Sequence, residues 1–316
     1  MTTITQLEYI VAVERLRHFG KAAKACHVSQ PTLSMQIQKM EEDLGVVIFD
    51  RDKKPVLPTE KGAVIIEQSK AVLREYSKLL EIGKTEAGVV RGTFRLGVIP
   101  TLAPYLLPLF VQKFSLALPR VDLIIDEMKT EDIIKSLRDD QIDGGLLVTP
   151  LHEKGLKERV LFYEPFYVYA STDHQLNSKS KIVESDLDSN DIWLLKDGHC
   201  FRDQVINYCS LRREQHSAVT NIKFEGGNFE TLRNLIRAGR GYTLFPHLFV
   251  SSLSASEKEK HVRGFKQPVP IREVSLVHRR DQWKTDILDA LKDTIVQSLP
   301  ADLKALPKGR VERVEI

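Results

Sequence analysis

The pattern of hydrophobic residues changes near Val89, and this change most constrains the fold. Before it, apolar residues recur almost only at helical spacing. After it, short apolar runs alternate with helical stretches: strands are predicted at 94–99, 121–128 and 144–148, and helices at 102–118 and 131–137. Such alternation is typical of parallel strands with helices on the faces of the sheet. The chain is therefore predicted to be an α+β protein with more than one domain.

Residues 1–58 are predicted to form a small helical domain with a hairpin. Helices are expected at 5–17 and 21–26, and a third begins after Ser29 as its N-cap, carries Pro31 in its first turn and ends at Gly45. A strand at 46–49, a charged turn and a short return strand follow. This order indicates a winged helix-turn-helix.

A long helix is predicted over residues 59–88. About 30 residues of helix span ~45 Å, which is too long for the helix to bury itself in a small domain. An apolar stripe that includes Ile66 and Leu73 runs along it. We therefore expect a linker helix that contacts a second copy of the chain.

Residues 91–300 are predicted to form a larger α/β domain. A strand at 160–171 leads into a second unit, and a strand at 269–279 and a helix at 283–299 follow that unit. The expected division is a first subdomain of about 91–162 and 268–300 and a second of about 163–267. The charged tail after Pro300 is expected to be frayed.

Composition excludes several classes of protein. The chain is 42% hydrophobic and 28% charged, which is a globular balance and not that of a disordered chain. No apolar run reaches the ~20 residues that span a bilayer, and the N-terminus lacks the basic start of a signal peptide, so a cytoplasmic protein is expected. The three cysteines lack metal-binding spacing, and neither a metal nor another cofactor is expected. Cys26 is expected to be a packing residue.

A basic segment points to DNA. No acidic residue lies between Glu14 and Glu41, whereas Arg and Lys recur there, as phosphate contacts require. Lys21 and Lys24 are expected to contact phosphates, and Arg51 to enter the minor groove. The short polar side chains expected to meet base edges are Gln30, Thr32, Ser34 and Gln36. A helical dimerisation module with a solvated basic face is the alternative.

A second group of candidate residues surrounds Cys200. His199 and Arg202 stand beside it, and cationic neighbours favour the thiolate form. Asp203 is placed to orient either cation. An exposed, reactive thiol is therefore expected, and a small buried hydrophobe is the alternative.

Cys209 follows nine residues later. If the segment is helical, those nine residues turn through ~900°, so the two sulfurs face opposite sides and lie ~13 Å apart along the axis. A disulfide needs Cα atoms within ~7 Å. A bond between these cysteines would therefore require the helix to unfold, which is the behaviour of a switch.

A resemblance to a known family is carried by AAKACHVSQPTLSMQIQKMEEDLGVVIFDRDKKPVLPTEKG. Its small pair, Ser-Gln-Pro-x-Leu-Ser, Glu-x-x-Leu-Gly, Phe-x-Arg and Thr-x-x-Gly resemble the winged helix-turn-helix of LysR-type transcriptional regulators, and the similarity continues to residue 300. It implies a dimerising linker helix and two Rossmann-like subdomains joined by crossing strands, as in periplasmic binding proteins. It also implies a homotetramer built as a dimer of dimers, RNA polymerase as a partner, and double-stranded operator DNA contacted by Gln30, Pro31, Ser34 and Arg51. Met35 stands where many members carry an arginine.

The motif Asp-Gly-His-Cys-x-Arg-Asp-Gln is similar to that of the hydrogen-peroxide-sensing LysR-type regulators. This resemblance implies that H2O2 oxidises Cys200, that Cys209 resolves it as a disulfide, and that a thiol reductant resets the protein. It also implies a peroxide pocket made by Thr101, Thr130, His199, Arg202 and Asp203. Such a regulator of oxidative-stress genes would not be an enzyme.

Three alternatives remain open. A regulator of the same family that senses a small metabolite between its subdomains would still respond as Cys200→Ser. A thiol peroxidase and a periplasmic solute-binding protein both leave the N-terminal domain unexplained.

Overall fold

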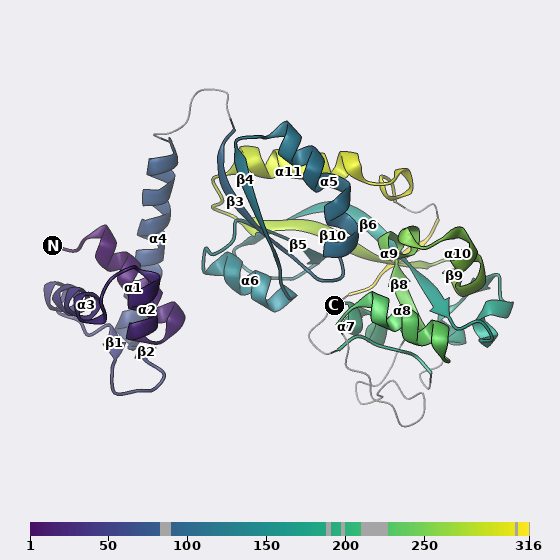
Figure 1. Ribbon diagram of the computed structural model, residues 1–316, viewed down its shortest axis with the longest axis horizontal. Coiled ribbons are helices and arrows are strands. Elements are labelled where there is room, and N and C mark those ends of the chain that lie inside the picture. The colour runs from purple at the N-terminus through teal and green to yellow at the C-terminus, as the bar shows by residue number, and fades with distance from the viewer. Residues whose placement is uncertain (83–89, 188–190, 197–199, 210–226, 307–308, 316) are drawn as a thin grey trace. The chain divides into compact units, whose positions relative to one another are not determined.

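The computed structural model describes residues 1–82, 90–187, 191–196, 200–209, 227–306 and 309–315 (Figure 1). The chain divides into two compact units, Met1–Val89 and Val90–Ile316. None of the helices in these described ranges is long and apolar enough to cross a membrane.

Three helices build the first unit: α1 (Ile4–Leu16), α2 (Phe19–Ala25) and α3 (Gln30–Leu44). Each begins at a side chain that accepts backbone N–H bonds: Thr3, His18 and Ser29 respectively. Their apolar faces meet in one core that includes Ile10, Leu33 and Ile37. The predicted helix-turn-helix is therefore present.

The hairpin is shorter and begins later than predicted. It pairs β1 (Phe49–Asp50) with β2 (Leu57–Pro58) in antiparallel fashion. The Glu41 carboxylate accepts the N–H groups of Ile48 and Phe49 at 2.7 and 3.2 Å. The N–H groups of this segment are therefore bound to the end of α3, while its Val47 and Ile48 carbonyls accept from Thr59 across the hairpin at 2.7 and 2.9 Å.

Helix α4 (Glu60–Ile82) begins after Thr59, whose hydroxyl accepts the N–H of Gly62 at 2.9 Å. The rest of the predicted helix, 83–88, lies outside the described residues. Ile66 is buried and Leu73 is half-buried against the core of the unit itself. The exposed apolar side chains of α4 are instead Val64, Val72, Tyr76, Leu79 and Leu80. Ile66 and Leu73 therefore do not form the free stripe that the sequence suggested.

The second unit is built on a mixed sheet. Strands β3 (Gly92–Val98), β4 (Val121–Glu127) and β5 (Gly144–Thr149) are parallel, as predicted. Strand β10 (Val269–Arg279) lies between β5 and β6 (Leu156–Ala170) and is antiparallel to both. Strands β5 and β6 therefore run in the same direction on either side of β10, although no helix joins them.

Strand β6 runs through both halves of this unit. Its first part pairs with β10, and its last residues pair with β8 (Tyr242–Pro246) and β9 (Val262–Phe265). Strand β9 also pairs with β7 (Lys181–Ile182). The chain thus crosses along β6 and returns along β10. The predicted boundaries of the two subdomains stay a prediction.

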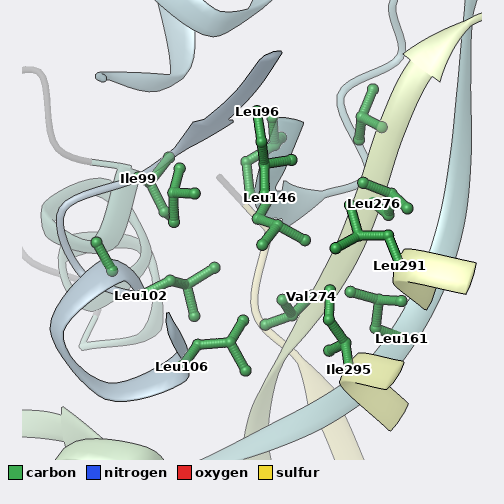
Figure 2. Packing of buried hydrophobic residues seen from close by; sticks show 14 of the residues in the cluster. Leu96, Ile99, Leu102, Leu106, Leu146, Leu161, Val274, Leu276, Leu291 and Ile295 are labelled. Carbon is green, nitrogen blue, oxygen red and sulfur yellow. The ribbon is translucent and has the colours of Figure 1, made fainter. Parts of the chain in front are cut away.

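The first hydrophobic cluster lies between the sheet and helices. Helices α5 (Ala103–Ala117) and α11 (Thr285–Ser298) lie side by side on one face, and α6 (Thr130–Arg138) covers the other (Figure 1). Figure 2 shows Leu102, Leu106, Leu291 and Ile295 packed around Leu96, Leu146, Val274 and Leu276 of the strands. Each such side chain contributes about 1.5–3 kcal/mol by leaving water.

The second cluster is rich in aromatic rings. It packs α8 (Phe229–Ala238) and α9 (His247–Ser252) on β8 and includes side chains of α7 (Cys200–Tyr208), and α10 (Ala255–His261) precedes β9. Phe201 of α7 lies edge-on to Phe166 and Phe229, with ring centroids 5.4 and 4.9 Å apart. Helix α7 is therefore anchored at its first turn. Short 3-10 turns at Gln175–Ser178, Glu184–Asp186 and Ala301–Leu303 complete the described elements.

The expectation of a frayed tail after Pro300 is wrong for residues 309–315. Strand β11 (Val311–Arg313) pairs in parallel with the start of β10, and the N–H of Val314 donates to the carbonyl of Ile271 at 2.9 Å. The side chain of Val314 is buried in the second cluster. Burial of Val314 in the core therefore holds the neighbouring charged residues of β11 against β10.

Candidate thiol site and nucleic-acid interface

Cys200 is the first residue of α7, and its thiol is free. Its side chain is only 7% exposed and packs in the first hydrophobic cluster. The exposed thiol expected from its polar neighbours is therefore not found. The helix explains this, because Arg202 lies two residues on and projects about 200° away around the axis.

Polar groups surround the buried sulfur. Burial raises the pKa of Cys200, and the charge of Asp203 adds to this. The Thr130 hydroxyl, the Arg272 charge and the Phe201 N–H act in the opposite direction on this pKa. The expected net stabilisation of the thiolate is therefore absent in the reduced form, but the donors that favour it are in place.

Arg272 is fully buried and held from two sides. Its guanidinium lies 2.7 Å from the carboxylate of Glu164, which is also fully buried. It donates to the Thr101 hydroxyl at 3.2 Å and to the Thr101 carbonyl at 3.4 Å. The same guanidinium lies 5.6 Å from the ring centroid of Phe201. One cation thus connects β10, β6 and the turn after β3 to the start of α7.

Glu164 extends this network to α9. Its carboxylate accepts the N–H of Leu248 at 2.6 Å in addition to the bonds from Arg272. An unpaired buried charge would cost several kcal/mol of folding free energy. The Arg272–Glu164 ion pair is therefore kept as long as β6 and β10 are paired. Arg272 is therefore held by Glu164 and Thr101, close enough to Cys200 for its charge to act on the pKa of the thiol.

The two hydroxyls predicted for the pocket are buried: that of Thr130 acts on the Cys200 thiol, and that of Thr101 binds Arg272. Thr130 begins α6, and its hydroxyl has no oxygen or nitrogen partner with normal geometry among the described residues. Thr101 accepts from Arg272, so its own proton is free to be donated. Arg202 donates to the carbonyl of Leu195 at 3.1 Å. His199 lies outside the described residues.

Arg272 and Glu164 were missed by the sequence prediction. The signal for them is a charge of each sign within two strands expected to be apolar, 160–171 and 269–279. Buried charges must be paired, and these two residues lie directly opposite each other in the β6–β10 ladder.

Cys209 follows the last turn of α7, where its N–H donates to the carbonyl of Val205. It is 8% exposed and packs in the second cluster. Burial and the charge of Glu184 raise the pKa of Cys209 to about 12. The helix between the cysteines is intact, so the two sulfurs lie in different cores. The described ranges bring together no group of His, Cys, Asp or Glu side chains that could hold a metal.

The predicted DNA-contacting residues lie on or beside α2 and α3. Lys21 and Lys24 of α2 are exposed, as are Gln30, Pro31 and Thr32 at the start of α3. Their backbone geometry is set by Ser29, whose hydroxyl accepts the Thr32 N–H at 3.3 Å and pairs with the Thr32 hydroxyl at 2.7 Å. The N-terminal end of α3 thus presents a polar, positively flanked surface.

The remaining predicted contacts are partly used within the unit. The amide of Gln6 donates to the Gln36 side chain and carbonyl, both at 3.2 Å. Arg51 donates to the Ser34 hydroxyl at 3.2 Å and pairs with the Glu41 carboxylate at 2.8 Å. Arg51 therefore connects the hairpin to α3 directly.

Comparison with known proteins identifies the family. The model of the LysR substrate binding domain matches residues 87–300, and that of the lysR-family bacterial regulatory helix-turn-helix protein matches residues 4–63. The chain belongs to the LysR family. This membership confirms the predicted fold class: an N-terminal winged helix-turn-helix, a linker helix and a C-terminal α/β domain.

Among LysR-family proteins the chain resembles OxyR, as its motifs indicated. It is 34% identical to the hydrogen peroxide-inducible genes activator of Pectobacterium carotovorum, over 96% of this chain and 99% of that protein. A full-length OxyR variant from Pseudomonas aeruginosa superposes with a TM-score of 0.74 at 33% identity, covering 94% of this chain and 98% of the other. An H2O2-bound OxyR mutant from Corynebacterium glutamicum gives 0.61 at 27% identity, covering 94% and 92%.

Proposed function

We propose that this LysR-family chain is a transcription regulator that senses hydrogen peroxide by oxidation of Cys200 and formation of a Cys200–Cys209 disulfide. One observation carries the proposal: hydrogen-bond donors and a cation act on the buried sulfur of Cys200, whereas among the described residues only burial and the Glu184 charge act on that of Cys209. The likeness to OxyR supports the choice of oxidant.

The first step is attack by the sulfur of Cys200 on one oxygen of H2O2. The O–O bond breaks, Cys200 becomes a sulfenic acid, and the departing hydroxide takes up the thiol proton to leave as water. Negative charge develops on the departing oxygen. Thr130 and Thr101 each keep a hydroxyl proton to donate to it, and Arg272 stabilises it through Thr101. His199, Arg202 and Asp203 complete the proposed pocket.

The second step joins the two cysteines. The Cys209 thiol displaces the sulfenic oxygen of Cys200, a disulfide forms, and a second water leaves. Because the sulfurs of an intact α7 lie ~13 Å apart along its axis, the helix must unfold first. The disulfide therefore selects a second conformation of the regulatory domain, which repositions the DNA-binding units. A cellular dithiol restores both thiols and is itself oxidised to a disulfide.

The proposed DNA ligand is a double-stranded promoter operator of oxidative-stress genes. A homotetramer, as a dimer of dimers, would bind it and contact RNA polymerase. Because these partners are cytoplasmic, so is the proposed site of action. The chain is proposed to regulate and not to catalyse.

DNA recognition is tested by two pairs of substitutions. Lys21→Gln with Lys24→Gln should weaken binding to all duplexes alike and reduce its salt dependence, because both residues would serve phosphates. Gln30→Ala or Ser34→Ala should instead relax base preference, by about 1–3 kcal/mol for a good contact. Unaltered affinity of all variants for every duplex would exclude this surface.

Dimerisation through α4 is tested at its exposed apolar residues. Leu79→Asp should produce monomers in sedimentation, because Leu79 is 64% exposed and lies on the same helical face as Val72 and Tyr76. Ser77→Asp, an exposed polar position on the same helix, is the matched control. Unchanged sedimentation of Leu79→Asp would remove this interface.

Peroxide sensing is tested by mass spectrometry before and after a small dose of H2O2. A linked Cys200–Cys209 peptide is expected, together with a change in DNA binding or in transcription from the operator. Neither should occur in Cys200→Ser. A Cys200→Ser protein that still responds to a signal would favour the alternative, a metabolite bound between the subdomains.

A further inference from the structure

Residues 311–315 lie against the helix that carries both cysteines. Strand β11 aligns them beside β10, and Val314 packs in the same cluster as Tyr208 and Cys209. Val314 is 5% exposed, so it is a core residue packed beside α7 and not part of a loose tail.

Two side chains of α7 bind this segment directly. Gln204, which is fully buried, donates its amide to the carbonyl of Val314 at 2.9 Å. One helical turn later, Asn207 donates to the carbonyl of Glu315 at 3.4 Å. Gln204 belongs to the motif around Cys200, yet the one hydrogen bond that its side chain makes among the described residues goes to this segment. Its contact with the segment gives this glutamine a function.

These contacts exist only while α7 is helical. Gln204 and Asn207 lie between the two cysteines, so unfolding that lets the sulfurs meet must move both side chains. Both hydrogen bonds and the packing of Val314 would then be lost. A buried amide and carbonyl left without partners raise the free energy of the opened state.

We propose that residues 311–315 are a strap that holds α7 in its helical form and so sets the rate at which oxidised Cys200 reaches Cys209. The strap acts on the second step, because its hydrogen bonds go to Gln204 and Asn207 of α7 and to Ile271 and Glu273 of β10, and none of those among the described residues joins Cys200, Thr130 or Thr101. Formation of the disulfide would in turn release the strap from α7. The strap binds the helical form of α7 and the disulfide requires the unfolded form, so each weakens the other. The role of the strap in disulfide formation rests on the proposed peroxide chemistry.

The strap is tested in the full chain by Val314→Asp and Gln204→Leu, and by a chain ended after Gly309. The matched control is Leu306→Asp, the same kind of change at a residue that is 55% exposed and outside β11. Hydrogen exchange of the α7 amides is measured first in the reduced proteins, without peroxide. Sulfenic acid formation in a Cys209→Ser background and disulfide formation with Cys209 present are then timed separately after H2O2 is added.

We expect α7 amides to exchange faster in the three strap variants, and disulfide formation to be faster by about tenfold, because the helical form loses contacts that the opened form lacks. Sulfenic acid formation should change less than about twofold by the same reasoning, and Leu306→Asp should match the unaltered chain. Unchanged exchange and unchanged disulfide formation would overturn the strap. If peroxide formed no sulfenic acid in any variant, the proposed sensing would be wrong, and the exchange rates alone would decide whether the segment holds α7.

Discussion

The two ends of α7 carry the same residue in different surroundings. Cys200 and Cys209 are buried to nearly the same extent, at 7% and 8% exposure. At Cys200, the Thr130 hydroxyl, the Phe201 N–H and the Arg272 charge oppose the effect of burial on the thiol pKa. At Cys209, burial and the nearby Glu184 charge both raise the pKa. The two thiols therefore differ in their polar partners and not in their exposure, and we expect the partners to decide which thiol is reactive.

In the proposed mechanism, this difference gives the two thiols separate roles in a switch. A thiol that is buried with donors reacts with a small polar oxidant that enters its pocket. A thiol that is buried without donors stays protonated and inert until α7 opens. Under this proposal, the helix would keep Cys209 away from Cys200 until the first step is complete.

The largest expected effect comes from removing one thiol at a time. In Cys200→Ser, rapid oxidation by H2O2 should be lost, because Cys209, with a pKa of about 12, supplies almost no thiolate near neutral pH. In Cys209→Ser, sulfenic acid should still form at Cys200 and then accumulate or over-oxidise, since no resolving thiol is near. Stopped-flow oxidation of the two variants measures both. Equal rates of oxidation by H2O2 for Cys200→Ser and the unaltered chain would show that Cys200 is not the more reactive thiol.

The pH dependence of oxidation should be the next largest effect. Burial raises the pKa of Cys200, so below that pKa each rise of one pH unit increases the thiolate fraction about tenfold. The rate of sulfenic acid formation should therefore rise steeply from pH 6 to pH 8. Dimedone trapping in Cys209→Ser follows this rate. A rate independent of pH across this window would mean that the donors outweigh burial.

Replacing Arg272 tests the cation at the reactive end. Arg272→Gln removes the charge that favours the Cys200 thiolate, and a nearby opposite charge shifts a pKa by about 1–3 units, so oxidation should slow by about 10- to 100-fold or more. Stability should also fall, because Glu164 is left buried without its partner. Arg233→Gln breaks the Arg233–Glu257 pair elsewhere in the same unit and is the matched control. Equal slowing in both variants would assign the effect to general loosening.

Much of the fold was predictable because its signals are local. Ser29 as an N-cap and Gly45 as a left-handed C-cap with φ of +63° set the bounds of α3 within the chain segment itself. The periodic apolar residues of α5 and α11 likewise report their own burial. The two cysteines of the candidate site followed from their neighbours and spacing, whereas Thr101 and Thr130 followed from the resemblance to peroxide-sensing LysR-type regulators.

The rest depended on pairing between distant segments. Arg272 meets Glu164 only because the register of β6 and β10 sets them opposite each other, 108 residues apart. Val314 is ordered only because β11 finds β10. The polar neighbours of Cys200 indicated a surface, yet the helical turn sends Arg202 toward Leu195 while the sulfur enters the core. Each of these features depends on long-range geometry that no single segment encodes.

The smallest expected effect on the rate of Cys200 oxidation comes from Thr130→Val. This substitution is also the most direct test of the difference between Cys200 and Cys209. The hydroxyl of Thr130 is buried and has no oxygen or nitrogen partner in the described part of the chain, so its main contribution is to the pKa of the Cys200 thiol. Loss of this donor should slow sulfenic acid formation by about 3- to 10-fold and leave Cys209 unaffected. Valine has nearly the same shape and no unsatisfied hydroxyl, so stability in urea should be unchanged or should rise by about 1 kcal/mol.

Thr243→Val is the control with the opposite balance. Its hydroxyl is equally buried but donates to the carbonyl of Trp193 at 2.7 Å, away from the thiol. That variant should lose about 1–3 kcal/mol because a buried carbonyl loses its donor, while the rate at Cys200 stays the same. Urea unfolding and stopped-flow oxidation of both proteins separate the two effects. If Thr130→Val lost stability and kept its oxidation rate, the hydroxyl would serve the fold, and the contrast between the two ends of α7 would rest on Arg272 and the Phe201 N–H alone.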